Sequence, residues 1–153
     1  MKKINYFFNF IQSYRKIFLK VFFFEIFYSL KFGELIPLMK VHNHNSRTDT
    51  VPSIFYFLHE ISRFIKNNKI RSVVDVGSGY GRVVNFISTL NGIRSIGVEY
   101  DKNVHVKALK LRKKNVKLYC GDIFKFKLEK FKSNCFILID PFKKIADRNK
   151  FIL

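Results

Sequence analysis

The stretch VVDVGSGYGR, residues 73–82, is an apolar, β-branched run that leads into three glycines at alternate positions. Valine-rich runs of this kind favour a buried strand, because β-branched side chains pack well on a pleated sheet. Glycine permits a tight turn and lets a ligand approach the backbone closely. A helix is expected over Tyr80–Leu90, and its first N–H groups would be available to an anionic group. The stretch therefore predicts a strand, a glycine turn and a helix that together form a binding site.

The C-terminal half of the chain continues to alternate between strands and helices. The first strand is expected over Arg71–Val76, followed by strands over Ser95–Glu99, Val116–Cys120 and Cys135–Asp140. A helix with a basic outer face is expected over Lys102–Lys114. Buried strands separated by helices imply right-handed βαβ units and a parallel sheet covered on both faces. The predicted fold class is therefore α/β.

Acidic residues stand at or just after the end of every predicted strand, namely Asp75, Glu99, Asp122 and Asp140. Open α/β sheets bind their ligands beyond the carboxyl ends of the strands. Glu99 ends the second strand, where its carboxylate can accept hydrogen bonds from both hydroxyls of a ribose. Asp122 would face an exocyclic amino group. Together these residues describe a site for a ligand that contains adenosine.

The spacing of the glycines distinguishes between adenosine ligands. A dinucleotide fingerprint would require glycine at position 82, where this chain has Arg82, and its third glycine is Gly81. The spacing D-x-G-x-G-x-G resembles motif I of the class I S-adenosylmethionine (SAM)-dependent methyltransferases. The similarity covers residues 71–142. More narrowly, Arg47–Pro52 with the glycine loop is similar to a poorly characterised bacterial group of these enzymes.

The resemblance implies a Rossmann-like fold, SAM as cofactor and methyl transfer to an unidentified acceptor. The residues implied to contact the cofactor are Asp75, Gly77, Ser78, Gly79, Gly81, Glu99, Tyr100, Asp122 and Ile123. Asp140 is the candidate catalytic residue that would orient a substrate amine, with Pro141 and Phe142 beside it and Phe142 as a stacking surface. Methyltransferases of amino groups carry Asn/Asp-Pro-Pro-Tyr/Phe here, so this chain is one proline short. Asp140 is equally readable as the end of a strand.

Two other functions remain open at this point. One is a catalytically inactive domain that binds SAM or a nucleotide, and the other is a basic nucleic-acid-binding protein on the same fold. The net charge of +18 comes from 29 Lys and Arg against 11 Asp and Glu. Such a charge attracts nucleic acid or anionic lipid, although an A/T-rich codon bias produces the same composition.

The full family fold has seven strands, and residues 141–153 are too few to complete it. The resemblance therefore predicts a sheet that stops at four strands in the order 3-2-1-4, in a truncated SAM-binding domain over residues 41–153. The fourth strand would lie at an edge of the sheet. An apolar edge invites dimerisation, unless the N-terminal helix covers it.

Residues 1–40 are interpreted as an apolar and basic helical segment. Residues 17–30 are almost continuously apolar but are interrupted by Lys20 and Glu25. Because a membrane-spanning helix needs about 20 apolar residues, spanning is not expected. No small-residue cleavage site follows, so a secretory signal is not expected either. A helix packed on the domain is favoured over a helix that lies on a membrane surface through residues 1–30.

A second helix is expected after a loop over residues 41–51, with Pro52 in its first turn and its end at Asn67–Lys69. Its apolar residues recur at helical spacing, which predicts one buried face. The residues of that face are Ile54, Phe57, Leu58, Ile61, Phe64 and Ile65.

The cysteines and histidines match no metal-binding pattern. Cys120 and Cys135 lie in apolar, strand-like stretches, which predicts buried free thiols and a reducing cytoplasmic setting. His42 and His44 form an H-x-H pair with no acidic or cysteine cluster near them, and they are interpreted as loop residues. No metal site is predicted.

Overall fold

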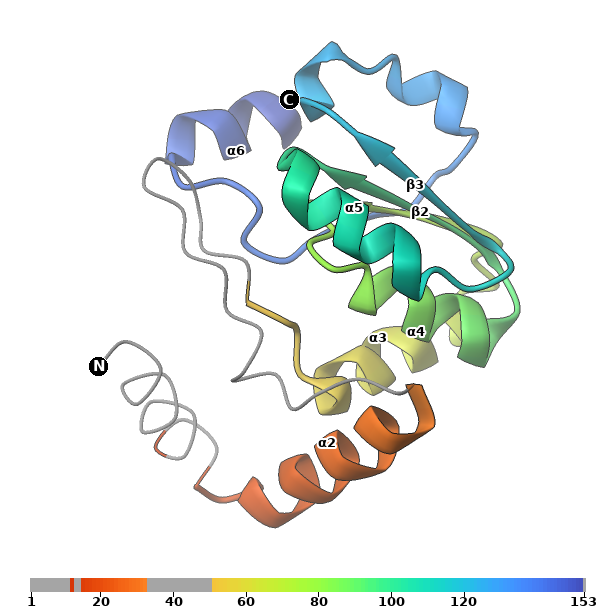
Figure 1. Ribbon diagram of the computed structural model, residues 1–153, viewed down its shortest axis with the longest axis vertical. Helices are drawn as coiled ribbons and strands as arrows, with labels where there is room; N and C mark the ends of the chain where they lie inside the picture. The colour runs from red at the N-terminus through yellow and green to blue at the C-terminus, as the bar shows by residue number, and fades with distance from the viewer. Residues whose placement is uncertain (1–11, 13–14, 33–50, 153) are drawn as a thin grey trace.

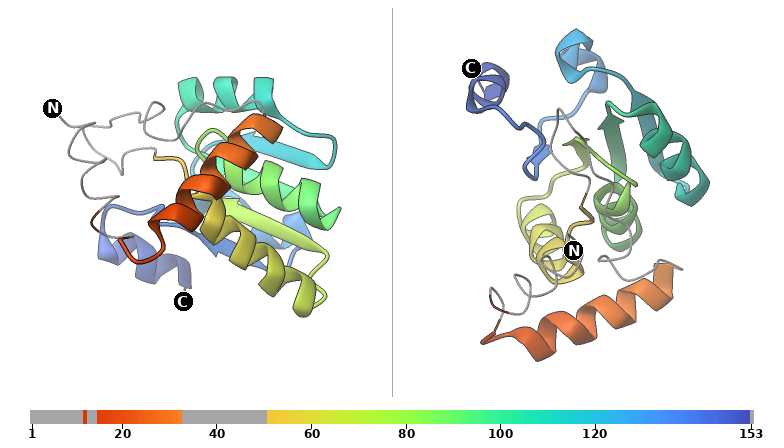
Figure 2. Two further views of the ribbon diagram at one scale, coloured as in Figure 1. Left: turned by 90° about the horizontal axis from the view of Figure 1, so that it is seen from below. Right: turned by 60° about the vertical axis from the view of Figure 1, so that its left-hand side comes forward.

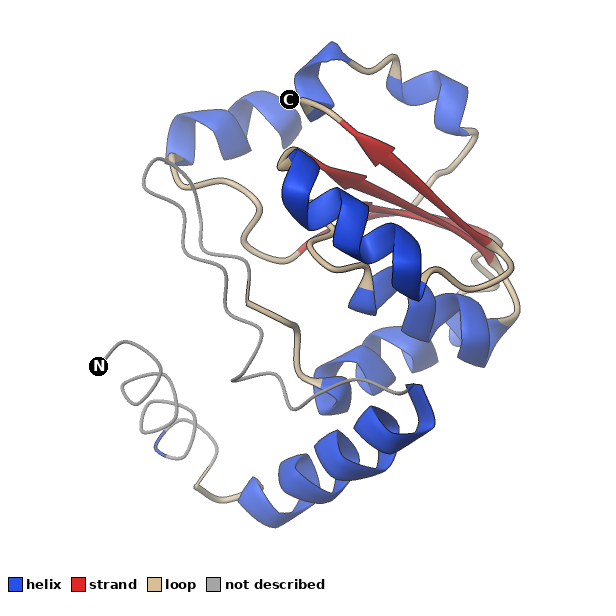
Figure 3. Ribbon diagram, in the orientation of Figure 1, coloured by secondary structure: helices blue, strands red, loops and turns tan. Residues whose placement is uncertain are grey.

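The protein was analysed as a computed structural model, which describes residues 12, 15–32 and 51–152 of the 153-residue chain (Figure 1). Helices and strands alternate through most of this part (Figure 3). In chain order the elements are α2 Phe18–Phe32, α3 Phe55–Asn67, β1 Ser72–Val76, α4 Arg82–Asn91, β2 Arg94–Glu99, α5 Lys102–Leu111, β3 Val116–Cys120, the 3-10 helices η2 Ile123–Lys125 and η3 Leu128–Phe131, β4 Phe136–Leu138 and α6 Ile145–Ile152.

The four strands form one parallel sheet in the order β3-β2-β1-β4, which confirms the predicted α/β class and strand order. The register pairs Val74 of β1 with Ile96 of β2 and with Phe136 of β4. Because the chain order reverses between β2 and β4, the carboxyl ends of β1 and its two neighbours flank a switch point of the sheet.

Alternate residues of β1 supply two hydrophobic cores, as strand geometry requires. Val73 packs with Phe55, Leu58 and Phe86 in the core beneath α3 and α4. Val74 packs on the opposite face, in a core that η2, η3 and side chains of α6 complete. Helix α5 lies beside α4. The sheet is therefore covered on both faces, one of them by regular helices and the other mainly by short 3-10 turns.

Helix α2 packs on the outside of α3 and α4 (Figure 2). The Tyr28 ring lies 5.5 Å from that of Phe55 and 4.9 Å from that of Phe86, and Val21 is fully buried. The expectation of a packed N-terminal helix is met by this element. The aromatic contacts of α2 are with α3 and α4, so it adds a layer on these helices instead of covering β4. Within the described residues, no helix is both long enough and apolar enough to cross a membrane.

Some predicted boundaries were wrong for backbone reasons. The helix expected from Tyr80 begins at Arg82, because the preceding turn runs through left-handed glycines. The strand expected over Cys135–Asp140 spans only Phe136–Leu138, and Asp140 has a φ of +47°, which a strand does not accommodate. The helix expected to reach Lys114 ends at Leu111.

The predicted buried face of α3 was also wrong in part. The helix begins at Phe55, so Pro52 lies outside its first turn. Phe57 and Phe64 are 40% and 60% exposed, whereas Phe55 is fully buried. Apolar residues surround much of this helix, so spacing alone does not select the stripe that faces the core. The buried stripe is Phe55, Leu58, Ser62 and Ile65.

Cys120 and Cys135 are both free thiols, as predicted, but Cys120 is exposed and Cys135 is only half-buried. The prediction of buried thiols was therefore wrong for Cys120, which lies at the end of the edge strand β3. No group of three or more potential metal ligands occurs in the part of the chain that the structure describes. His42, His44 and most of the stretch 41–51 lie outside the described residues.

Candidate functional site

The turn after β1 is built from three glycines with positive φ. Gly77, Gly79 and Gly81 have φ angles of +75°, +53° and +80°, a region in which side chains other than glycine are strained. The N–H groups of Gly77 and Ser78 both donate to the Val98 carbonyl, at 2.9 and 3.0 Å. These bonds hold the turn against the end of β2.

A fourth glycine, in the middle of β2, permits this close approach. A Cβ atom on Gly97 would lie 2.7 Å from Ser78 Oγ and 2.7 Å from Leu118 Cδ2, which is shorter than real contacts of Cβ atoms. Glycine at this position therefore lets the turn and β3 press against β2. The sequence analysis did not single out Gly97, although glycine inside a predicted strand is a recognised sign of close backbone approach.

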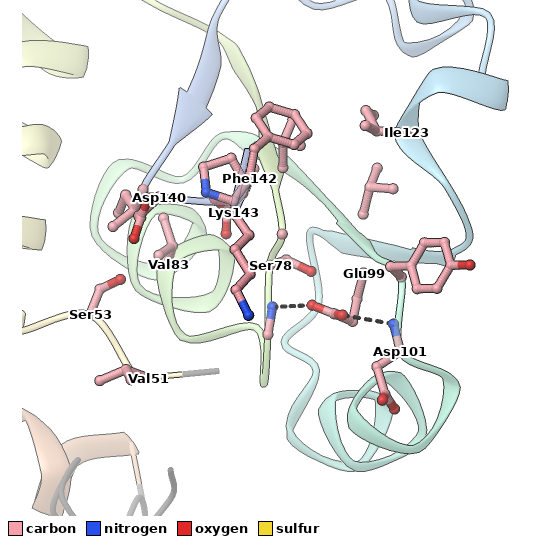
Figure 4. Close-up of a pocket in the computed structure, with 18 of the residues that line it drawn as sticks. Val51, Ser53, Ser78, Val83, Glu99, Asp101, Ile123, Asp140, Phe142 and Lys143 are labelled. Carbon is pink, nitrogen blue, oxygen red and sulfur yellow. Dashed lines mark hydrogen bonds between the residues drawn. The ribbon is translucent and has the colours of Figure 1, made fainter. Parts of the chain in front are cut away.

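Glu99 connects the turn to the start of α5 (Figure 4). One carboxylate oxygen accepts from the Gly79 N–H at 2.8 Å, and the other accepts from the Asp101 N–H at 2.8 Å. The side chain is almost fully buried. Asp101 in turn caps α5 by accepting from the N–H groups of Asn103 and Val104 at 2.7 and 3.0 Å. Because a carboxylate oxygen has two acceptor positions, Glu99 keeps the capacity to bind hydroxyl groups.

Asp75 is a buried acid with an unmet hydrogen-bonding requirement. Its side chain is 2% exposed, and Oδ2 has no hydrogen-bond partner. Burial, with a further contribution from the negative charge of Glu99, raises the pKa of Asp75 well above its usual value of 3.8. A cationic group bound next to Asp75 would supply the missing partner and favour the ionised carboxylate.

The ends of β3 and β4 contribute the remaining predicted residues. Asp122 caps η2 by accepting from the Phe124 N–H at 3.1 Å, and Ile123 is a nearly buried apolar neighbour. Asp140 is exposed and adopts the left-handed conformation, which aspartate tolerates better than most residues. Pro141 approaches the glycine turn, because a Cβ atom on Gly77 would lie 2.9 Å from Pro141 Cβ.

Phe142 is packed into an aromatic cluster. Its ring stacks on Phe124 at 5.6 Å between centroids and meets Phe151 of α6 at 5.7 Å. The sequence suggested Phe142 as a stacking surface for a substrate. The structure shows protein partners for this ring at the border of the site.

These elements surround one cavity of about 420 Å³, within the size range of small-molecule sites. Every predicted site residue lines this cavity except Gly81, whose carbonyl instead accepts the Asn85 N–H at the start of α4. In Figure 4, Asp140 and Ser53 lie on one side of the cavity and Glu99 and Asp101 on the other. The structure brings the predicted residues together, and their roles in binding stay predictions.

Several lining residues were not predicted from sequence. Lys143 and Lys144 add positive charge at the cavity, and Ser53 approaches it from the segment before α3. The two lysines directly follow the motif after β4, so their position in the chain could have suggested them. Ser53 carries no local signal, because only the packing of α3 brings it there.

Arg82 is the unpredicted residue with the most extensive contacts. It is 4% exposed, and its guanidinium pairs with Glu25 of α2 at 3.0 Å and donates to the Ser53 carbonyl at 3.1 Å. The guanidinium also lies 4.1 Å from the centroid of the Phe55 ring. Glu25 accepts the Phe55 N–H with its other oxygen. This ion pair joins α2 to the first turn of α4, at the border of the cavity.

No protein-family model matches the chain, and no curated protein matches it. Among solved structures, a proposed RNA methyltransferase from Pyrococcus horikoshii is 25% identical with a TM-score of 0.51, over 65% of this chain and 54% of its own. A protein-L-isoaspartate O-methyltransferase is 17% identical with a TM-score of 0.52, over 64% and 33%. An RNA methyltransferase from Salinibacter ruber, solved with S-adenosyl-L-homocysteine, is 25% identical with a TM-score of 0.49, over 57% and 60%.

The chain thus spans between a third and three fifths of the length of these proteins. The two structures with TM-scores above 0.5 are described as methyltransferases of different substrates. Their shared feature is the α/β fold. The chain therefore has the Rossmann-like fold of SAM-dependent methyltransferases, which confirms the fold that the glycine motif implied.

Proposed function

We propose that the chain binds S-adenosylmethionine at the carboxyl edge of its sheet and transfers the methyl group to an acceptor. The observation that carries this proposal is the meeting of Asp75, Glu99 and Asp122 around one cavity beneath the glycine turn. The fold shared with methyltransferases supports it independently.

The residues present fit this cofactor. Asp75, with its unpartnered oxygen, and the glycine turn would hold the methionine portion, whose ammonium group is the kind of cation that a buried carboxylate favours. Glu99 would bind the ribose hydroxyls, while Asp122 and Ile123 would contact the adenine. Tyr100, which is half-exposed at the end of β2, would border the ribose and adenine.

SAM supplies an electrophilic methyl group, so the protein has to place a nucleophile in line with it and, where required, accept a proton. Asp140 is the candidate for orienting the acceptor. Its exposed side chain lies at the cavity, in a backbone conformation of the kind that functional sites often retain. Pro141 fixes the backbone that follows Asp140 and contacts the glycine turn.

The charge favours an anionic acceptor, and we include nucleic acid in the proposal on this ground. Lys143 and Lys144 lie at the cavity, and the whole chain carries a net charge of +18. Cationic side chains beside a site attract phosphates and raise the rate of encounter. The alternative function, SAM binding without catalysis, shares the cofactor site and differs only in product formation.

The test is transfer of a labelled methyl group from SAM to total RNA, DNA or protein, measured together with release of S-adenosylhomocysteine. We expect the wild-type chain to label the nucleic acid. Gly97→Ala would push Ser78 and the glycine turn out of place, and we expect it to lower transfer at least tenfold, about 1.4 kcal/mol.

Gly92→Ala is the matched control for this assay. Gly92 also has a positive φ, of +66°, but a Cβ atom there would meet nothing within 4 Å. We expect this variant to retain transfer once it is folded. SAM binding without any product would support the inactive alternative, and equal losses in both variants would contradict the assigned site.

A further inference from the structure

Helix α2 presents a second apolar face to solvent, opposite the face that it buries on α3 and α4. The exposed residues recur three and four positions apart, which places them on one side of the helix. Their exposed fractions are Leu19 68%, Phe22 43%, Phe23 65%, Ile26 37%, Phe27 60% and Leu30 79%. These side chains form the outer face of α2. Large apolar patches of this kind on a folded protein mark interaction surfaces.

The charges on and beside the outer face of α2 are of one sign. Arg15, Lys16, Lys20 and Lys31 are exposed in the turn before the helix and along it. The acid of the helix, Glu25, is 5% exposed and points into the protein, where Arg82 pairs with it. The ion pair removes the one negative charge of α2 from solvent. What α2 offers to a partner is therefore apolar and cationic.

The dimensions of α2 are those of a helix that lies on a membrane. Its 15 residues correspond to about 22 Å, which is less than the roughly 30 Å of a bilayer core. An apolar face flanked by lysine and arginine suits the boundary between acyl chains and headgroups, where the apolar side chains leave water and the cations meet anionic lipid.

We propose that the outer face of α2 docks on the surface of an anionic lipid bilayer. The net charge of +18 complements such a surface over the whole molecule, and the outer face supplies the apolar contact that charge alone lacks. Docking would act on the element that Glu25 and Arg82 join to the first turn of α4. The cavity would then be held close to a membrane. This inference is independent of the proposed methyl transfer.

The test is co-sedimentation of the full chain with vesicles of phosphatidylcholine and phosphatidylglycerol, compared with vesicles of phosphatidylcholine alone. Phe23→Ser/Leu30→Ser removes two highly exposed side chains from the outer face of α2. We expect at least a tenfold loss of affinity for the anionic vesicles, because these two side chains would no longer leave water on docking. Both positions are largely exposed, so the fold should survive, and circular dichroism checks this.

Phe64→Ser/Ile152→Ser is the matched control, since these side chains are 60% and 69% exposed but belong to α3 and α6. Charge alone attracts any basic protein to anionic lipid, so the difference between the two double variants decides. Binding reduced in the α2 variant but within twofold of wild type in the control supports the proposal. Equal binding by both variants, or no binding of wild type at low salt, overturns it.

A second copy of the chain is the competing occupant of the outer face. Sedimentation velocity over a range of protein concentrations tests for it. A dimer that Phe23→Ser/Leu30→Ser abolishes, with vesicle binding unchanged by the same substitutions, would overturn membrane docking and assign this face to self-association.

Discussion

At the scale of single residues, the site is organised around two acids in different environments. Glu99 accepts two backbone hydrogen bonds, whereas one oxygen of Asp75 has no hydrogen-bond partner. A buried and incompletely bonded carboxyl group lowers the stability of the ligand-free protein. Such a group is expected where a ligand, and not the protein itself, completes the bonding.

Asp75→Asn should therefore stabilise the free protein and weaken SAM binding. The folded pKa of Asp75 is raised, so between pH 3.8 and that raised value the folded state keeps a proton that the unfolded state releases. Stability of the wild type consequently falls as pH rises through this window. The asparagine variant lacks this dependence, and its melting temperature at pH 7 should be higher by about 2–4 °C per kcal/mol recovered.

Thermal unfolding of both proteins between pH 4 and pH 8, with SAM titrations at pH 7, checks this prediction. The melting temperatures should diverge as pH increases, and SAM affinity of the variant should fall about tenfold or more, since the proposed ammonium contact is lost. Parallel pH profiles, or unchanged affinity, would show that Asp75 has neither role.

The residues at strand ends could be predicted from sequence because strand geometry fixes where they lie. Asp75, Glu99 and Asp122 follow apolar runs, and parallel strands bring their carboxyl ends to one edge. The contact of Gly97 with Ser78 could not be predicted in the same way, since it depends on how closely two strands and a turn pack.

At the scale of secondary structure, the strands were predicted well because their apolar runs are short and bounded by glycine or charge. The order of the sheet followed from the resemblance. The face of α3 and the length of β4 were not predicted correctly, because Phe57 and Phe64 fit the helical period without being buried and Asp140 takes a left-handed turn. Both errors come from tertiary contacts and backbone conformation, which local patterns do not encode.

The link between α2 and α4 rests on the buried Glu25–Arg82 pair, and Glu25→Gln tests it. The substitution removes one charge and leaves Arg82 buried with a reduced set of acceptors. Removing one partner of a buried pair typically costs about 3–5 kcal/mol in the free energy of unfolding. We expect about 3 kcal/mol, because glutamine can still accept from the Phe55 N–H.

Glu60→Gln is the control for this measurement. Glu60 pairs with Arg63 at 3.2 Å on the surface, where both side chains are at least half exposed. Loss of such a pair costs about 0–1 kcal/mol. Urea unfolding of the three proteins gives the comparison, and similar free energies for the two variants would mean that the buried pair does not hold α2 in place.

At the scale of the whole molecule, the chain combines a cofactor-type site with a strongly basic surface and an apolar outer helix. The sequence supplied the charge, but it left open whether residues 17–30 pack on the domain or meet a membrane. The structure shows how one helix can do the first and remain available for the second, since α2 has apolar residues on two opposite sides. A single hydrophobic period could not reveal both faces.

The central claim is that this fold binds SAM between the glycine turn and Glu99, and calorimetric titration of the purified chain tests it most directly. We predict micromolar binding of SAM and of S-adenosylhomocysteine by the wild type. Glu99→Ala removes the ribose acceptor and the carboxylate that holds the Gly79 and Asp101 N–H groups, so its affinity should fall at least about a hundredfold, or 2.7 kcal/mol. Absence of binding by the folded wild type, or undiminished binding by Glu99→Ala, would contradict the account.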